Sequence, residues 1–167
     1  MKKMTEQNVR AALAGESQAH VKYLAYAEKA EAEKMPNVAR AFRANSHAER
    51  VHAANYLRTL SEVKSTKDNL AAAVGGETFE VEEMYPAYIE VARFQGEKTA
   101  EMYLSAALAA EKVHAGIYKR AMEAVVKGQD LEGRPIHVCG QCGFTMEGEA
   151  PDKCPVCGAP RSKFVTF

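Results

Sequence analysis

Apolar residues recur at steps of three and four positions from residue 5 to about residue 127, the spacing that aligns side chains on one face of an α-helix. Turn-forming residues are scarce in this stretch, and its two prolines are Pro36 and Pro86. The pattern predicts four long helices, at about Thr5–Lys34, Asn37–Val63, Thr66–Phe94 and Gly96–Lys127. Because short breaks between helices favour antiparallel neighbours, the expected fold class is an all-α four-helix bundle.

The third predicted helix contains a stripe of core-facing positions and a proline. An uninterrupted α-helix would present the stripe on one face, and its members are Leu70, Ala73, Glu77, Glu80, Met84 and Val91. Pro86 lies inside this helix. Because proline has no N–H to donate to the carbonyl four residues earlier, we expect a kink there.

The composition changes after Lys127. Residues 128–135 read GQDLEGRP, which is typical of a linker. The 32 residues that follow are too few to fold by apolar burial alone. The chain is therefore predicted to have two domains, residues 1–133 and residues 134–167. The second domain needs a covalent cross-link or a bound metal to stay folded.

Composition and charge argue against several classes of protein. The chain is 47% apolar and 26% charged, as expected of a protein that buries a core. Lys and Arg together number 22, as do Asp and Glu, which argues against a nucleic-acid partner. No apolar run approaches the roughly 18 residues that a membrane span needs, and the first residues lack a signal-peptide pattern. We expect a cytoplasmic protein with no membrane partner.

An internal repeat indicates the chemistry. Residues 48–58 read AERVHAANYLR and residues 110–120 read AEKVHAGIYKR, with seven of eleven positions identical. Both copies contain Glu-x-x-His, and each is preceded on the previous helix by a glutamate, 33 or 34 residues before the repeat's own glutamate. The six residues are Glu16, Glu49, His52, Glu77, Glu111 and His114. Since positions i and i+3 share one face of a helix, each Glu-x-x-His offers two ligands to one centre.

These six residues fall in the middle of the predicted apolar faces, where unpaired charge is costly. Bound cations would neutralise them, and carboxylates with imidazoles suit iron or manganese. A glutamate from each of two helices with Glu-x-x-His from each of the other two is the dimetal ligand pattern of ferritin-like bundles. The pattern predicts a dimetal site. The alternative is that the glutamates are surface residues and the histidines are ordinary core residues.

Two more residues are candidates on the same faces. Glu80 lies one turn after Glu77, and its counterpart in the first half is Ala19. It is either a solvent-facing glutamate or a switchable metal ligand. Tyr23 lies two turns after Glu16, and either packs in the core or lies near the ligands and the oxidant.

All the cysteines lie in two C-x-x-C-G knuckles, separated by 11 residues, which contain Cys139 and Cys142, then Cys154 and Cys157. Each knuckle directs two thiolates at one metal, while its glycine permits the tight turn. Two knuckles together predict a four-thiolate site for iron or zinc. Disulfides are the alternative, and they would suit a secreted protein.

A dimetal bundle followed by a short knuckle domain resembles the rubrerythrin family over nearly the whole chain. The motifs that carry the resemblance are GESQA at 15–19, Glu49-x-x-His52, Gly76-Glu77-x-x-Glu80, EMYP at 83–86, Glu111-x-x-His114 and the four cysteines. The resemblance implies a ferritin-like diiron bundle and a rubredoxin-like Fe(Cys)4 domain, with zinc possible at the cysteines.

The resemblance also implies a role for each ligand. Glu49 and Glu111 bridge the irons, Glu16 and Glu77 are terminal ligands, His114 binds one iron, and the other iron exchanges between His52 and Glu80 with oxidation state. The implied reaction is reduction of hydrogen peroxide to water in oxidative-stress defence. Electrons come through the Fe(Cys)4 centre from an external donor, a rubredoxin or an NAD(P)H-dependent reductase.

Two other functions compete with the peroxidase. One is a ferroxidase or small iron store like ferritin, and the other is a binding module with structural zinc in both sites. The knuckle domain argues against the store, because storage needs no one-electron relay.

The link between the second and third helices predicts a homodimer with exchanged domains. Ferritin-like bundles join parallel second and third helices by a long crossover. Here the link is about residues 63–65 and a few more, which spans roughly 10–20 Å, against about 37 Å for a helix of about 25 residues. We predict that the first hairpin of one chain packs on the second hairpin of its partner. An extended segment at residues 68–76 would instead allow the crossover within one chain.

Overall fold

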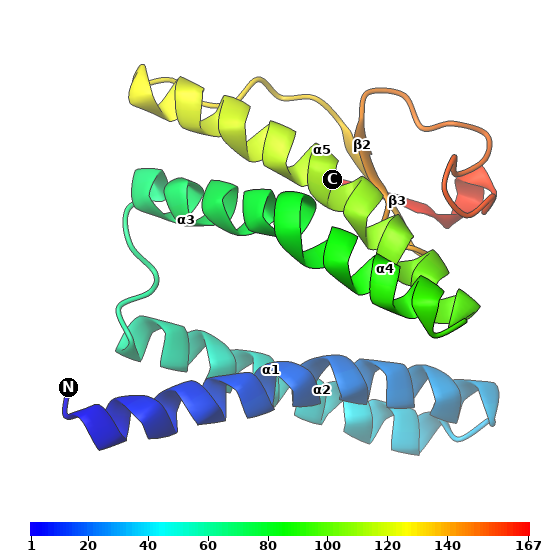
Figure 1. Cartoon of the computed structure of the whole chain (residues 1–167). Coiled ribbons are helices and arrows are strands. Elements are labelled where there is room, and N and C mark those ends of the chain that lie inside the picture. Colours follow the sequence, from blue (N-terminus) through cyan, green and yellow to red (C-terminus); the bar gives the residue numbers. More distant parts are fainter. The chain divides into compact units, whose positions relative to one another are not determined.

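The computed structural model describes residues 1–167 and places them in two compact units, Met1–Lys64 and Ser65–Phe167. Figure 1 shows the helices expected from the sequence and a small stranded segment at the C-terminal end, which confirms the predicted fold class. The domain boundary predicted between residues 133 and 134 falls within the second unit and stays a prediction. None of the helices combines the length and the apolarity needed to cross a lipid bilayer.

The first unit is a hairpin of α1 (Lys3–Ala32) and α2 (Pro36–Thr59), which lie side by side (Figure 1). Small side chains, Ala27, Ala30 and Ala39, are buried together between the helices, with Phe42 packed against them. Residues of this size let two helix backbones approach closely, so the hairpin is held by close packing of methyl groups.

A polar contact crosses the same alanine-rich interface. The hydroxyl of Ser46, which is 1% exposed, donates to the backbone carbonyl of His20 at 2.9 Å. The His20 ring Nδ1 lies 2.8 Å from Ser46 Oγ, so it is the proton donor in that contact. Buried polar groups satisfied in this way tie one helix to the other. His20 therefore has a structural role.

α2 is shorter than the periodicity predicts, because it ends at Thr59 and not near Val63. Ser61 has a φ of 58°, in the left-handed region where a helix commonly terminates. The link to the next helix consequently begins at residue 60, three residues earlier than expected.

The third predicted helix is three consecutive elements, α3 (Thr66–Phe79), the π-helical turn η1 (Glu80–Met84) and α4 (Tyr85–Phe94). α3 begins at a cap in which Ser65 Oγ accepts a hydrogen bond from the Asp68 N–H at 3.2 Å. The Tyr85 N–H bonds to the Glu80 carbonyl, five residues earlier. The π turn thus restarts the helix, and Pro86 falls in the first turn of α4, where its missing N–H costs little.

The extra residue in the π turn changes which side chains of α4 face the core. Each residue rotates an α-helix by about 100°, so the apolar face after the turn is displaced by one position. Ile89 and Ala92 are 7% and 6% exposed, whereas Val91 is 53% exposed. The prediction that Val91 lies on the core face was therefore wrong, because the stripe assumed uninterrupted α-helical phase.

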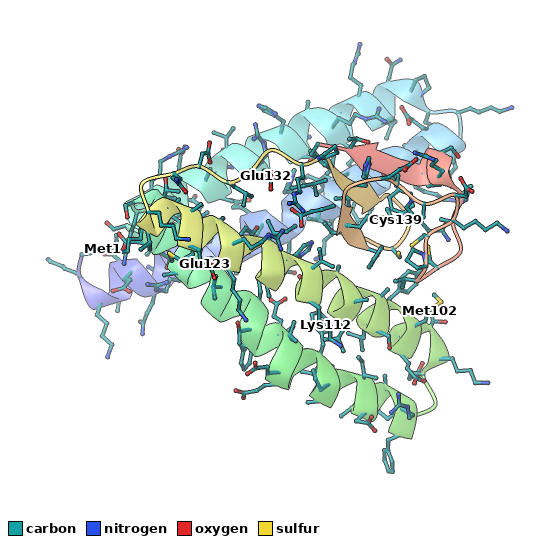
Figure 2. The ribbon with its side chains drawn as sticks, turned by 90° about the horizontal axis from the view of Figure 1, so that it is seen from above. Met1, Met102, Lys112, Glu123, Glu132 and Cys139 are labelled. Atoms are coloured by element: carbon teal, nitrogen blue, oxygen red, sulfur yellow. The ribbon has the colours of Figure 1, made fainter.

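α5 (Lys98–Val126) packs against α3, η1 and α4 in the second unit, and an irregular segment then leads to a small three-stranded antiparallel sheet. β1 (Ile136–Cys139) lies between β2 (Thr145–Glu147) and β3 (Phe164–Thr166), and a short 3-10 turn, η2 (Arg161–Lys163), precedes β3. An ion pair between Arg120 of α5 and Glu147 of β2 joins the sheet to the helix. Figure 2 labels Glu132 and Cys139, between which the chain passes from this irregular segment into the sheet.

Candidate metal centres

The first cluster of ligand-type side chains lies between α1 and α2. Glu16 comes from α1, and Glu49 and His52 come from successive turns of α2, so that one ligand atom of each lies within 4.8 Å of the others. His52 Nδ1 is 2.9 Å from Glu49 Oε2 and 4.0 Å from Glu16 Oε1. A hydrogen bond to Glu49, followed by burial and the Glu49 charge, raises the pKa of Glu16. We call these three residues the first trio.

The second cluster has the same composition and lies between α3 and α5. Glu77 comes from α3, and Glu111 and His114 come from α5; this second trio also has ligand atoms within 4.8 Å of one another. His114 Nδ1 is 2.7 Å from Glu111 Oε2 and 3.8 Å from Glu77 Oε2. Burial, followed by a hydrogen bond and charge from Glu111 and charge from Glu80, raises the pKa of Glu77 to about 7.

One atom of the second trio shows that the residues fit a metal. Glu77 Oε2 is buried and has no hydrogen-bond partner. Leaving a buried carboxylate oxygen without a partner costs free energy. The Nδ1 atom of His114 lies 3.8 Å from this oxygen. A cation held by Glu77, Glu111 and His114 would satisfy this oxygen and neutralise the carboxylates. The donor set of oxygens and imidazole nitrogen suits iron.

Glu80 lies beside the second trio, at the first position of η1. Burial and then the charge of Glu111 raise its pKa, while His114 lowers it. Its carboxylate is therefore close enough to interact electrostatically with Glu111 and His114. It is not one of the three residues of the second trio, whose ligand atoms lie within 4.8 Å of one another. π turns inserted in helices are frequent at functional sites.

Tyr23, the other candidate of the sequence analysis, lies in an aromatic group. Its ring centroid is 6.3 Å from that of Tyr26 and 6.1 Å from that of Phe42. These contacts correspond to the packing alternative considered for this residue.

Tyr85 is a site residue that the sequence reasoning missed. Burial is the main cause that raises its pKa, followed by the charges of Glu111, Glu80 and Glu77, so its hydroxyl is within electrostatic reach of the second trio and Glu80. Tyr85 is eight positions after Glu77 and would be rotated from it by about 80° around a plain α-helix. The extra residue of η1 gives Tyr85 the phase that position 84 would otherwise have. EMYP at 83–86 was the only available signal.

The four cysteines form the third cluster, in the small C-terminal domain. Cys139 and Cys154 are buried at 1% and 2% exposure. The Sγ atoms of Cys139 and Cys157, and those of Cys142 and Cys154, are 3.7 Å apart. A tetrahedron with metal–sulfur bonds of about 2.3 Å has edges of about 3.8 Å, and a disulfide requires about 2.05 Å. The geometry fits a four-thiolate metal site.

Backbone N–H groups surround these thiols. Burial alone would raise the pKa of Cys139, but N–H groups of Gln141 and Cys142 and neighbouring thiols lower it to about 7. Burial raises the pKa of Cys142 to about 12, against a hydrogen bond from the Phe144 N–H that lowers it. Gly143 and Gly158, the last residue of each knuckle, have φ of 77° and 73°, which only glycine adopts at little cost.

Comparisons with known proteins agree with these clusters. The family model described as Rubrerythrin matches residues 7–122, and the model described as Rubrerythrin, rubredoxin-like domain, matches residues 137–165. Rubrerythrin-2 of Clostridium acetobutylicum is 38% identical over 98% of this chain and 97% of its own length. Nigerythrin of Nitratidesulfovibrio vulgaris is 32% identical over 98% of this chain and 86% of its own length. A structure of fully reduced, all-ferrous nigerythrin superposes with a TM-score of 0.55 at 32% identity, covering 98% of this chain and 86% of that one.

The fold, the trios and the four-cysteine cluster define a ferritin-like diiron protein with a rubredoxin-like domain. The chain belongs to the rubrerythrin family. Its cofactors are accordingly those of the family, a diiron site and a four-cysteine rubredoxin-like site, and it is a diiron redox protein.

Proposed function

We propose that this chain is a non-haem diiron peroxidase that reduces hydrogen peroxide to water in oxidative-stress defence. The balanced reaction is H2O2 + 2 H+ + 2 e− → 2 H2O. The observation that carries the proposal is the presence of the second trio and the four-cysteine cluster in one compact unit. A carboxylate-rich site suited to a two-electron reduction is then served by a one-electron relay. An iron store would have no use for that relay.

The proposed diiron ligands are both trios together with Glu80. Glu49 and Glu111 would bridge, Glu16 and Glu77 would be terminal, His114 would be a constant ligand, and His52 and Glu80 would alternate on the other iron. When bound, two ferrous ions supply the two electrons of the reaction.

The chain's own groups would bind and orient the peroxide. The pKa of Tyr85 is raised from a value already well above neutral, so its hydroxyl is protonated at neutral pH and could donate a hydrogen bond to an oxygen near the second trio. The partly buried carboxylates of Glu77 and Glu111, 18% and 16% exposed, limit the access of water. Tyr23 remains a candidate for contact with the ligands or oxidant of the first trio.

We further propose a homodimer in which each diiron site takes one trio from each chain. The link between α2 and α3 is residues 60–65, which extend over at most about 22 Å. α2 itself, at 24 residues, is about 36 Å long. Residues 68–76 are helical and supply no extra length. A link of this length falls short of a crossover along α2, which supports our proposal that hairpins are exchanged between partners. A dimer whose diiron sites each contain Glu16 and Glu111 of the same chain would contradict this arrangement.

The external donor is proposed to be a rubredoxin or an NAD(P)H-dependent reductase, in a reducing compartment such as the cytoplasm. Clustered free thiols with no disulfide geometry support this setting.

The test is anaerobic reduction of the iron-loaded protein, followed by rapid mixing with peroxide. Ferric tetrathiolate is red and its ferrous form is nearly colourless, so return of the red colour reports electron delivery. We expect both centres to reoxidise, with two electrons consumed per peroxide. If reduced protein stays colourless with peroxide but oxidises and retains excess Fe(II), the ferroxidase alternative is correct. If the purified protein is colourless and holds zinc at the cysteines, the relay is absent.

A further inference from the structure

His114 is held on both sides of its ring, and the second contact comes from the small C-terminal domain. His114 Nδ1 faces Glu111 and Glu77, as described above. His114 Nε2 lies 2.7 Å from Thr145 Oγ1, at the first residue of β2, 31 positions later in the chain. Thr145 is 3% exposed, so water does not compete for this contact. Ile117, Ile136 and Val138 line the same pocket, and Tyr118 is its one further polar side chain.

The direction of the hydrogen bond follows from the other partner of Thr145. Its hydroxyl donates to the Gly143 carbonyl at 3.2 Å. A hydroxyl has one proton, so Thr145 Oγ1 is left as an acceptor towards His114. A neutral imidazole that donates from Nε2 has a lone pair on Nδ1, the atom that faces the carboxylates. This is the tautomer that a metal held by the second trio requires.

The same contact continues to the four-cysteine cluster. The Gly143 carbonyl belongs to the peptide unit whose N–H is that of Phe144, and this N–H donates to Cys142 Sγ. One run of hydrogen bonds therefore leads from the His114 ring through the Thr145 hydroxyl and a single peptide unit to a thiol of the second metal site.

We propose that Thr145 is a positioning residue for the bundle metal site: its buried hydroxyl fixes His114 in the tautomer and orientation that present Nδ1 to iron. This inference rests on the proposed assignment of His114 as an iron ligand. Groups that orient a ligating histidine in this way typically change metal affinity by roughly 10–100-fold when removed. A second contact between the same two elements, the ion pair of Arg120 and Glu147, does not involve this hydroxyl.

The chain offers a matched control. His137 Nδ1 lies 2.9 Å from Thr166 Oγ1, another contact of threonine and histidine in the same small domain. His137 belongs to none of the three ligand clusters. Replacing Thr166 by valine removes a hydroxyl of the same kind while leaving the second trio untouched.

The experiment uses full-length protein with iron retained at the cysteines and the bundle site emptied by a chelator. Fe(II) alone is titrated back without oxygen, in competition with a chromophoric chelator, into the unvaried protein and the variants Thr145→Val, Thr145→Ser and Thr166→Val. We expect Thr145→Val to bind Fe(II) roughly 10–100-fold more weakly. Thr145→Ser and Thr166→Val should remain within about threefold of the unvaried protein, since the serine hydroxyl can occupy the place of the threonine hydroxyl.

A second measurement separates positioning from simple loss of packing. In a His114→Ala background, Thr145→Val should weaken Fe(II) binding no further, because the two residues act as one unit. Circular dichroism and the red absorption report that each variant is folded, and Thr145→Ala replaces Thr145→Val if the valine variant is not. The inference is overturned if the variant lacking the hydroxyl binds within twofold of the unvaried protein, or if Thr145→Ser is as weak. Failure of the unvaried protein to bind Fe(II) in the bundle would instead refute the proposed function.

Discussion

The two trios are built from the same residues on equivalent helices, yet their surroundings differ. The short contacts of histidine with glutamate within each Glu-x-x-His are alike, 2.9 Å for His52 with Glu49 and 2.7 Å for His114 with Glu111. The side chain of His52 is 51% exposed, whereas that of His114 is 31% exposed and also meets Thr145.

The comparison separates what a helix provides from what the rest of the fold provides. Spacing of i and i+3 is sufficient to bring a glutamate and a histidine together, so both hairpins achieve it. The additional neighbours of the second trio are Glu80 and Tyr85, supplied through the π turn, and Thr145, supplied by the small domain. We infer that His114 is the fixed histidine and His52 the freer one, which agrees with the proposed exchange of His52 with Glu80.

The largest expected effect, loss of the diiron centre, is the same for both trios. Glu49→Ala and Glu111→Ala should each remove the diiron centre, because each eliminates a proposed bridge between the irons. Both variants should keep the red centre, since the four cysteines lie in a separate small core. Iron content per chain and the visible spectrum measure the two sites, with Glu132→Ala as an exposed control. Loss of both centres in one variant would contradict two independent modules.

Removing the histidines one at a time should reveal the difference between the trios. His114→Ala should weaken Fe(II) binding roughly tenfold more than His52→Ala, because only His114 is oriented by a second hydrogen bond. Competition with a chelator under argon measures both affinities. Equal losses would show that the extra contact on His114 has no consequence for metal binding.

A stability change confined to the first hairpin is expected from Ser46→Ala. The substitution removes the buried hydroxyl that donates to the His20 carbonyl and accepts from the His20 ring, while the ring Nδ1 keeps its contact with the Ser46 carbonyl at 3.0 Å, so the expected cost is about 0.5–1.5 kcal/mol. Hydrogen exchange should accelerate in α1 and α2 and remain unchanged in α3 and α5. Ser17→Ala is the control, since Ser17 is exposed and bonds within its own helix. Uniform acceleration over the whole chain would refute the confinement of the effect.

The smallest effect is a pH dependence of the metal-free protein. Burial and Glu111 raise the pKa of Glu77 from 4.5 to about 7 in the folded state, so folding favours the protonated carboxyl. The contribution is fully present below the unfolded pKa and is lost as pH rises through about 7. The melting temperature without metal should therefore fall between pH 4.5 and 7, and Glu77→Gln should reduce the slope. A slope of the opposite sign in the unvaried protein would show that ionisation of Glu77 does not destabilise the metal-free fold.

The helices and the trios were predictable from the sequence because their determinants are local. A repeat of three and four positions marks a helix wherever it occurs, and Glu111 and His114 need only one turn to meet. The position of Tyr85 was not predictable in this way, since a single extra residue in η1 changes the phase of everything after it. The contact of Thr145 with His114 joins residues 31 positions apart and depends on how the small domain docks on α5. Periodicity contains no information on such docking.

The π turn also determines where this chain can change in length. Deleting one residue from 81–84 would convert η1 into an ordinary α turn and leave α4 in nearly its present phase, because the turn already absorbs one extra residue. A second inserted residue would have no such turn to absorb it and would rotate α4 by about 100° about its axis. Ile89 and Ala92 would then leave α5. An insertion of the same size between α5 and β1 would only lengthen a tether. Insertions should therefore be rejected at the first place and tolerated at the second, although neither segment contains a metal ligand other than Glu80.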